Sequence, residues 1–71
     1  MKKIKFGNDT GFLLGEERQR LGLSQEELSR RTGLSSHTIS LIECGKRAPR
    51  CDSLERLANS LGLVVEIGGQ S

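Results

Sequence analysis

The 71-residue chain has no tryptophan or tyrosine, one proline, two cysteines and no long apolar run. A membrane span needs about 20 apolar residues, and a signal peptide needs an apolar stretch behind its basic start; the sequence shows neither pattern. We therefore expect a cytoplasmic protein with no membrane partner. Hydrophobic residues make up 34% of the chain, which suits one compact helical domain rather than a disordered tail. Because so short a chain has a thin core, close helix packing or a partner subunit becomes important.

The two cysteines, Cys44 and Cys51, are too few to frame a fold. In the cytoplasm they are expected to be reduced thiols, and a disulfide that distorts the intervening loop is the alternative. Together with His37 they supply at most three metal ligands without the paired spacing of a zinc site, so we expect no metal and no cofactor. His37 also has no nearby acid in sequence to orient it, so an enzyme is not expected.

Positive charge is concentrated in one short segment. The net charge of +2 does not by itself indicate a nucleic-acid partner, but Lys46, Arg47 and Arg50 lie within five positions of one another. A local cluster of cations is what contact with phosphate requires. A solvated loop is the alternative, and charge alone does not separate the two.

The ends of the chain differ from its helix-rich middle. Residues 1–9 alternate lysine with apolar side chains and are predicted to form a basic arm or a short strand. Residues 10–62 are predicted to form the helical domain. Residues 63–71 are predicted to form a strand and a tail, because Leu63–Ile67 is rich in β-branched residues and is bounded by glycines.

Four helices are predicted within residues 10–62 from capping residues and glycine stops. The second has the clearest start, because Ser24 and Glu27 have the spacing of a capping box. The predicted caps are, in chain order, Asn8 to Thr10, Ser24, Ser35 or Ser36, and Asp52. The predicted stops are Gly22, Gly33, Gly45 and Gly62. The residues expected to face the core include Leu14, Leu28, Thr32, Ile39, Ile42, Leu54, Leu57, Ala58 and Leu61.

The second and third predicted helices are short and are joined by Gly33-Leu34-Ser35. Neither is long enough to be stable alone, so they must pack on each other and on the flanking helices. A steep crossing leaves the third helix exposed and slim enough to enter the major groove of DNA. Its outer face carries serine, threonine and histidine, whose side chains both donate hydrogen bonds to base edges and accept them.

Four runs of residues in this region carry a resemblance to a known family. They are Leu23-Ser24-Gln25-Glu26-Glu27-Leu28, Thr32-Gly33-Leu34-Ser35, Thr38-Ile39-Ser40-Leu41-Ile42-Glu43 and Gly45-Lys46-Arg47-Ala48-Pro49. Residues 10–63 resemble the XRE family of Cro/CI-like helix-turn-helix regulators. The resemblance implies a mainly α, lambda-repressor-like DNA-binding domain of four to five helices, here with a short C-terminal β-strand. It also implies a sequence-specific double-stranded DNA-binding transcriptional regulator, a repressor that acts as a dimer on a palindromic operator.

The resemblance further implies roles for individual residues. Gln25 is expected to contact a phosphate and to brace the first residues of the recognition helix. The positions that contact bases or the adjacent backbone are occupied by Ser35, Ser36, His37, Thr38, Ser40 and Leu41. The loop that contacts the sugar-phosphate chain is matched by Lys46, Arg47 and Arg50.

A structural pair and two departures from the family pattern complete the expectations for the domain. Arg18 and Glu43 match a pair that ties the first helix to the end of the third. Ser29 occupies a position where alanine is usual, and its hydroxyl is expected to bond a backbone carbonyl four residues back. Leu41 occupies a position where a polar base reader is frequent, so it either contacts a thymine methyl or packs inward.

The third departure is the apolar segment Leu63–Ile67, which replaces the usual fifth helix. A five-residue strand cannot satisfy its own backbone groups, so it needs a partner strand. The candidates are Lys3–Phe6 and the same segment of a second subunit, of which we favour the second, giving a homodimer. A small domain with such a strand resembles the HipB-like antitoxins, which bind a kinase-like toxin and repress their own operon. An antitoxin is therefore the alternative function, and a protein-interaction module without DNA binding is a further one.

Overall fold

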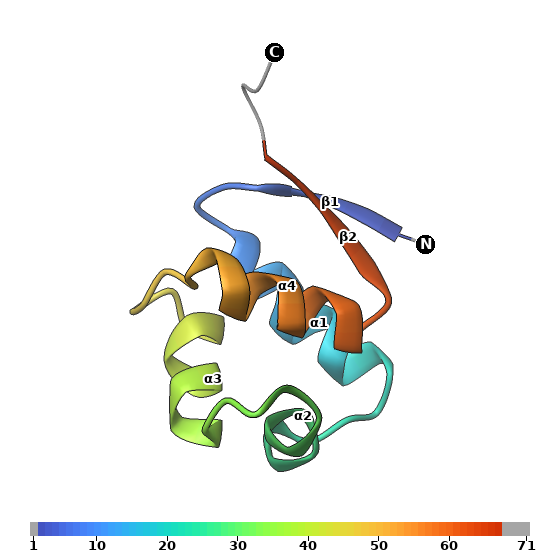
Figure 1. Ribbon diagram of the computed structural model, residues 1–71, viewed down its shortest axis with the longest axis vertical. Helices are drawn as coiled ribbons and strands as arrows, with labels where there is room; N and C mark the ends of the chain where they lie inside the picture. The colour runs from blue at the N-terminus through green and yellow to red at the C-terminus, as the bar shows by residue number, and fades with distance from the viewer. Residues whose placement is uncertain (1, 68–71) are drawn as a thin grey trace.

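The computed structural model describes residues 2–67. In chain order these residues form β1 (Lys2–Phe6), α1 (Thr10–Arg20), α2 (Gln25–Thr32), α3 (Ser36–Glu43), α4 (Cys51–Ser60) and β2 (Leu63–Ile67). The mainly α fold with a short C-terminal strand, expected from the sequence, is thus confirmed, and residues 2–67 contain four helices rather than five. In Figure 1 the strands cover the top of the molecule, α1 and α4 occupy its middle, and α2 and α3 lie at the bottom.

The hydrophobic core lies between the four helices and continues to the sheet. Each helix contributes the side chains that its apolar spacing predicts, and Ile4 and Leu63 extend the core beneath the strands. Leu21, directly after α1, is 44% exposed. The buried apolar residues are Ile4, Leu14, Leu28, Ile39, Ile42, Leu54, Leu57, Ala58, Leu61 and Leu63.

The tail segment finds its partner strand within the same chain, which was the alternative to the favoured pairing with a second subunit. β2 pairs in parallel with β1, and Ile4 lies opposite Val65 in the register. Such a parallel pair needs a long crossover, which the four helices supply. The N-terminal segment is therefore a strand rather than a free arm, and one edge of β2 is satisfied without a second subunit. On the outer face, Lys3 and Glu66 form an ion pair at 3.8 Å.

One predicted helix cap lies at the expected position without its capping bond, and another is at the wrong position. Asp9 precedes α1 but makes no side-chain capping bond, while the hydroxyl of Thr10 accepts a hydrogen bond from the Gly7 N–H at 2.6 Å. α4 begins before Asp52, with Arg50 at the cap position. Asp52 instead lies in the first turn, where its carboxylate accepts a hydrogen bond from the Ser53 N–H. Its negative charge there interacts favourably with the positive end of the helix dipole.

Candidate nucleic-acid interface

The α2–turn–α3 unit begins each helix with a serine cap. The Ser24 hydroxyl accepts from the Glu27 N–H at 3.0 Å, and the Ser35 hydroxyl accepts from the Thr38 N–H at 3.0 Å. Between the two helices Gly33 has a φ of 80°, a left-handed conformation that costs glycine little. These local features fix where α3 starts, as the sequence predicted.

Hydroxyl groups hold the turn between the two helices. The Ser29 hydroxyl donates to the Leu34 carbonyl, five residues ahead, so the expected bond to a carbonyl four residues back is wrong. The Thr32 hydroxyl donates to the Leu28 carbonyl at 2.8 Å and accepts from the Leu34 N–H at 3.2 Å. Serine in place of alanine thus adds a bond from α2 to the turn that leads into α3.

Two glycines let α1 approach the C-terminal end of α3. A Cβ added at Gly11 would lie 1.9 Å from the Ile42 carbonyl oxygen, and one at Gly15 would lie 3.1 Å from the Glu43 side chain. Sequence reasoning missed both positions. Their four-residue spacing on one face of α1 is a signal that points to a close helix contact.

A buried arginine joins α1 to the end of α3. The Arg18 guanidinium donates to both Glu43 carboxylate oxygens, at 2.7 and 3.0 Å, and to the Leu23 carbonyl at 2.6 Å. The side chains of Arg18 and Glu43 are 10% and 11% exposed. The hydrogen bonds to Glu43 raise the pKa of Arg18 above its ordinary value, although burial acts in the opposite direction. The structure therefore brings together the pair expected from the family resemblance, as a bidentate contact that fixes the orientation of α3.

Gln25 joins this pair from the start of α2. Its amide donates to the Glu43 carboxylate at 3.1 Å. The residue therefore braces the last residue of α3, rather than the first residues that the family pattern indicates. The side chain is half-buried, so it remains open to solvent at the edge of α3.

The residues predicted to read bases lie on the outer face of α3, while Ile39 and Ile42 point inward. Ser35 and His37 are exposed, and the other predicted readers are half-buried. The hydroxyl of Ser35 also donates to that of Thr38 at 2.9 Å. Leu41 is half-buried, which agrees with either of its expected roles. In Figure 1 α3 lies at the edge of the molecule, away from the sheet.

The cationic loop follows α3 directly. The N–H groups of Lys46 and Arg47 both donate to the Leu41 carbonyl, at 2.9 and 3.2 Å, which holds the loop against the end of the helix. Arg50 occupies the cap position of α4. All three cations are exposed, so they lie beside α3 with their charges in solvent.

The cysteines and the histidine do not form a common site. Cys44 lines a cleft beside Phe12, whereas Cys51 lines a different one beside Leu54. Within residues 2–67 no group of three histidine, cysteine or acidic side chains is arranged to hold a metal ion. No helix of the described chain is long and apolar enough to span a membrane.

Comparison with known proteins agrees with this geometry. Residues 10–66 match the family profile described as a helix-turn-helix domain. An uncharacterized HTH-type transcriptional regulator of Methanothermobacter thermautotrophicus is 42% identical over 50 residues, which cover 70% of this chain and 72% of that protein. A second one, from Sinorhizobium fredii, is 41% identical over 46 residues, which cover 65% of this chain and 60% of the relative. No solved structure matches the chain significantly.

The chain belongs to the helix-turn-helix family, since the family profile covers most of its length. It is an XRE-like regulator, as the four runs of residues predicted. The narrower resemblance to HipB-like antitoxins finds no support in these relatives.

Proposed function

We propose that this protein is a sequence-specific double-stranded DNA-binding repressor that acts in the cytoplasm as a dimer on a palindromic operator. One observation carries the proposal: an exposed helix with a polar outer face, α3, is held rigidly by the buried Arg18–Glu43 pair and is followed by an exposed cationic loop. Rigid presentation of small polar side chains suits the major groove, whose base edges offer distinct donors and acceptors. Both curated relatives are named as transcriptional regulators.

In this proposal the interface divides into readers and positioners. The readers are Ser35, Ser36, His37, Thr38, Ser40 and Leu41 on α3. The positioners are Gln25, Lys46, Arg47 and Arg50, which contact the phosphate backbone. Phosphate contacts set affinity and register, whereas contacts with base edges set sequence preference.

Fluorescence anisotropy with a labelled random duplex at several salt concentrations tests the proposal. The logarithm of the binding constant should fall linearly with the logarithm of the salt concentration, because phosphate contacts release bound counterions. Selection from a random duplex library should then enrich a two-fold symmetric sequence. Absence of binding at low salt would refute the proposal and favour a protein-interaction module.

The position of the sheet supports a dimer that reads two half-sites. β1 pairs with one edge of β2, and among residues 2–67 no strand pairs with its other edge, where a second copy would add. When two identical strands pair in antiparallel fashion, a two-fold axis perpendicular to the sheet relates one strand to the other. Because the sheet and α3 lie at opposite ends of the molecule (Figure 1), such an axis directs both copies of α3 toward the same side. Recognition helices about 34 Å apart would then enter successive major grooves.

The open edge of β2 also favours the alternative function, an antitoxin that binds a kinase-like toxin. An unpaired strand edge is a common site for strand addition by another protein. The test is a pull-down of the product of the adjacent reading frame by the purified protein. Co-elution of a kinase-like protein at a fixed stoichiometry would support the antitoxin, and a neighbouring frame that encodes no such protein would exclude it.

A further inference from the structure

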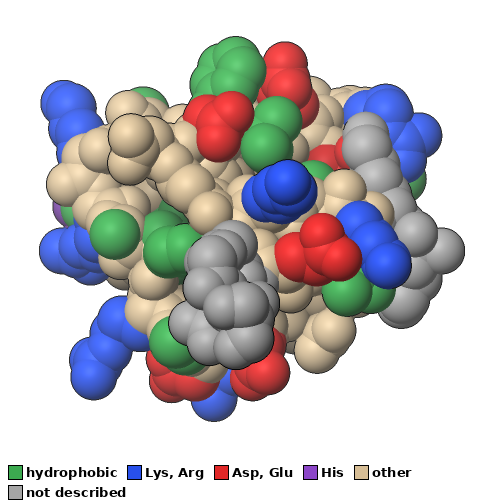
Figure 2. Space-filling model, turned by 90° about the horizontal axis from the view of Figure 1, so that it is seen from above, with side chains coloured by type: hydrophobic (Ala, Val, Ile, Leu, Met, Phe, Trp, Pro, Cys, Tyr) green, Lys and Arg blue, Asp and Glu red, His purple; other side chains and the backbone are tan. Residues whose placement is uncertain are grey.

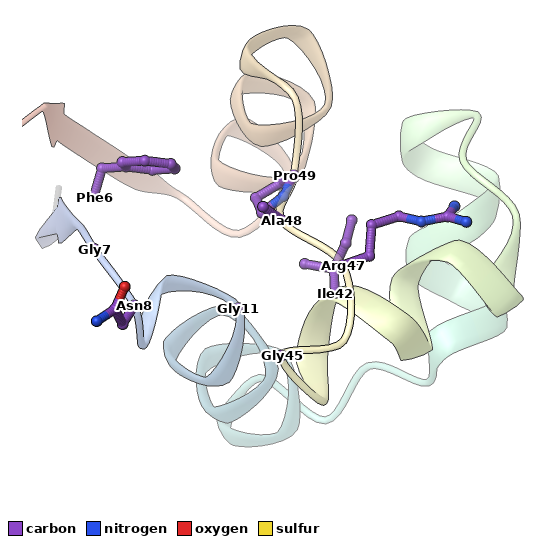
Figure 3. Close-up of a pocket in the computed structure, with 9 residues that line it drawn as sticks. All are labelled: Phe6, Gly7, Asn8, Gly11, Ile42, Gly45, Arg47, Ala48 and Pro49. Carbon is purple, nitrogen blue, oxygen red and sulfur yellow. The ribbon is translucent and has the colours of Figure 1, made fainter.

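Two clefts flank the Phe6 ring where β1 meets the loop before α4. The larger, of about 320 Å³, extends to Gly11 of α1 and to the loop from Gly45 to Pro49 (Figure 3). The smaller, of about 200 Å³, is lined by apolar side chains from α4 and the residues before it. Phe6 and Pro49 line both clefts, and the two together are called the Phe6 cleft below. The residues that line the smaller part are Phe6, Pro49, Cys51 and Leu54.

Phe6 is exposed on the face of β1 that elsewhere points to the core. Alternation along the strand places it on the same face as Ile4, but Phe6 is 40% exposed whereas Ile4 is 9% exposed. In Figure 3 the ring points toward Ala48 and Pro49 across an open space. Within the described part of the chain, an aromatic ring thus lies beside a depression that no side chain fills.

The cationic loop borders one side of the Phe6 cleft through Arg47. Arg47 lines the larger part, and its side chain extends away from Phe6, so its charge lies outside the apolar space (Figure 3). Three acids lie nearby: Asp52 accepts from the Ser53 N–H, Asp9 lies near Gly7, and Glu55 lies beside Cys51 and Leu54 on the side away from the cationic loop. The exposed cations beside the opening are Lys46, Arg47 and Arg50. A complementary ligand is therefore apolar at its centre and acidic around it.

We propose that the Phe6 cleft binds a protein segment in which a large apolar side chain is flanked by aspartate and glutamate. The apolar side chain enters beside the Phe6 ring, and the flanking acids contact the cationic loop. In the proposed function the same loop contacts phosphate, so the bound segment and DNA exclude each other. This competition rests on the proposed function. The cleft is then the site where a partner protein releases the regulator from its operator.

Amide chemical-shift mapping of the full chain tests the binding step directly. The probe is a short synthetic peptide with a central Leu-Phe pair between runs of aspartate and glutamate. Its titration should shift the amides of Gly7, Gly11 and Gly45 saturably. A matched peptide with Ala-Ala at the centre should bind at least fivefold more weakly. Equal binding of the two peptides, or shifts confined to the cationic loop, would overturn the proposal, because charge alone would then explain the contact.

Variants and competition test the rest. Phe6→Ala should weaken binding of the Leu-Phe peptide at least fivefold, whereas Phe12→Ala, which removes the 60% exposed phenylalanine of α1, should not change it. The peptide should also displace a labelled duplex from the wild-type protein, and the Ala-Ala peptide should do so only at higher concentration. Wild-type protein that binds no duplex contradicts the proposed function alone, because peptide mapping still reports on the cleft. Duplex binding with no mapped peptide contact contradicts this proposal alone.

Discussion

Glu43 connects side chains of different helices beside the proposed interface. It accepts hydrogen bonds from Arg18 of α1 and from Gln25 of α2 while it belongs to α3. Three helices therefore meet at one carboxylate. Ions this deeply buried are stabilised only while they are paired, so each partner depends on the others.

Replacement of Glu43 by glutamine should destabilise the fold strongly. Glu43→Gln keeps the size of the side chain but leaves the Arg18 charge buried without its counterion, which costs roughly 3–5 kcal/mol. Urea unfolding followed by circular dichroism measures the change. Glu27→Gln is the matched control, because Glu27 pairs with Arg30 at the exposed surface of α2, and its unfolding midpoint should hardly move. Equal midpoints for the two variants would show that the Arg18 pair is not structural.

His37 and Arg47 should separate reading from positioning. His37→Ala should change the preference at particular base pairs, with a cost of about 1–3 kcal/mol for the preferred base. Arg47→Ala should instead weaken binding to all sequences and lower the salt slope by about one. Anisotropy with the operator and with single base-pair variants at two salt concentrations measures both effects. The division fails if the two variants behave alike.

At the scale of elements, α1 and α3 approach more closely than they could if α1 carried a side chain at the point of contact. Gly11 places the α1 backbone against the carbonyl of Ile42, at the end of the recognition helix. This contact and the Arg18–Glu43 pair fix α3 at one end, and the Ser29 and Thr32 hydroxyls fix the turn at its other end. The recognition helix is short, so its position is set by these neighbours rather than by its own stability.

A methyl group at Gly11 should disrupt this contact. Gly11→Ala brings a Cβ within 1.9 Å of a backbone oxygen that cannot rotate away, and overpacking of this kind costs about 1–3 kcal/mol even after the helices shift apart. Operator affinity should fall as well, since α3 is displaced. Gly7→Ala is the control, because its added Cβ would have an ordinary contact at 3.8 Å. A thermal midpoint of Gly11→Ala equal to that of Gly7→Ala would contradict the close approach.

At the scale of the whole molecule, the sheet side offers a small and mixed surface for association. Figure 2 views the molecule from this side and shows charged side chains of both signs among separate hydrophobic patches. Stable complexes bury at least about 1,200 Å² of surface. Pairing through one five-residue strand edge with such surroundings would bury less than this. We therefore expect the proposed dimer to assemble on its operator, where two half-sites hold the copies together.

The sign of a charge introduced at Val64, on the edge of β2, should decide whether two copies assemble on the operator. In antiparallel pairing centred on Val65, Val64 of one copy faces Glu66 of the second copy. Val64→Glu should then oppose like charges and abolish cooperative binding, while Val64→Lys, which loses the same apolar contact, should preserve it. Val64 is 37% exposed, so both variants should fold. Sedimentation with operator duplex measures the stoichiometry. Equal cooperativity in both variants would exclude this strand edge as the dimer interface.

The sequence by itself determined the helices and their order, because caps, glycine stops and apolar spacing act over a few residues. Ser24, Ser35 and Gly33 have their predicted local roles in the structure. Local rules were less reliable where several polar side chains compete, so the cap at Asp52 was misplaced and the Ser29 hydroxyl bonds a different carbonyl. The individual DNA-contacting residues stay predictions.

The tertiary structure decided the contacts between segments far apart in the chain. β-Branched composition predicted a strand at Leu63–Ile67, but the partner favoured from the sequence, a second subunit, is not the one that the structure shows, because strand pairing depends on which edge is brought nearby. The chain's own N-terminal strand occupies one edge, and no strand within residues 2–67 pairs with the other. Gln25 bonds Glu43 rather than the start of α3, since the helix crossing sets which side chains come within reach. The sequence thus determined which helix faces outward, and the packing of distant elements decided what holds that helix in place.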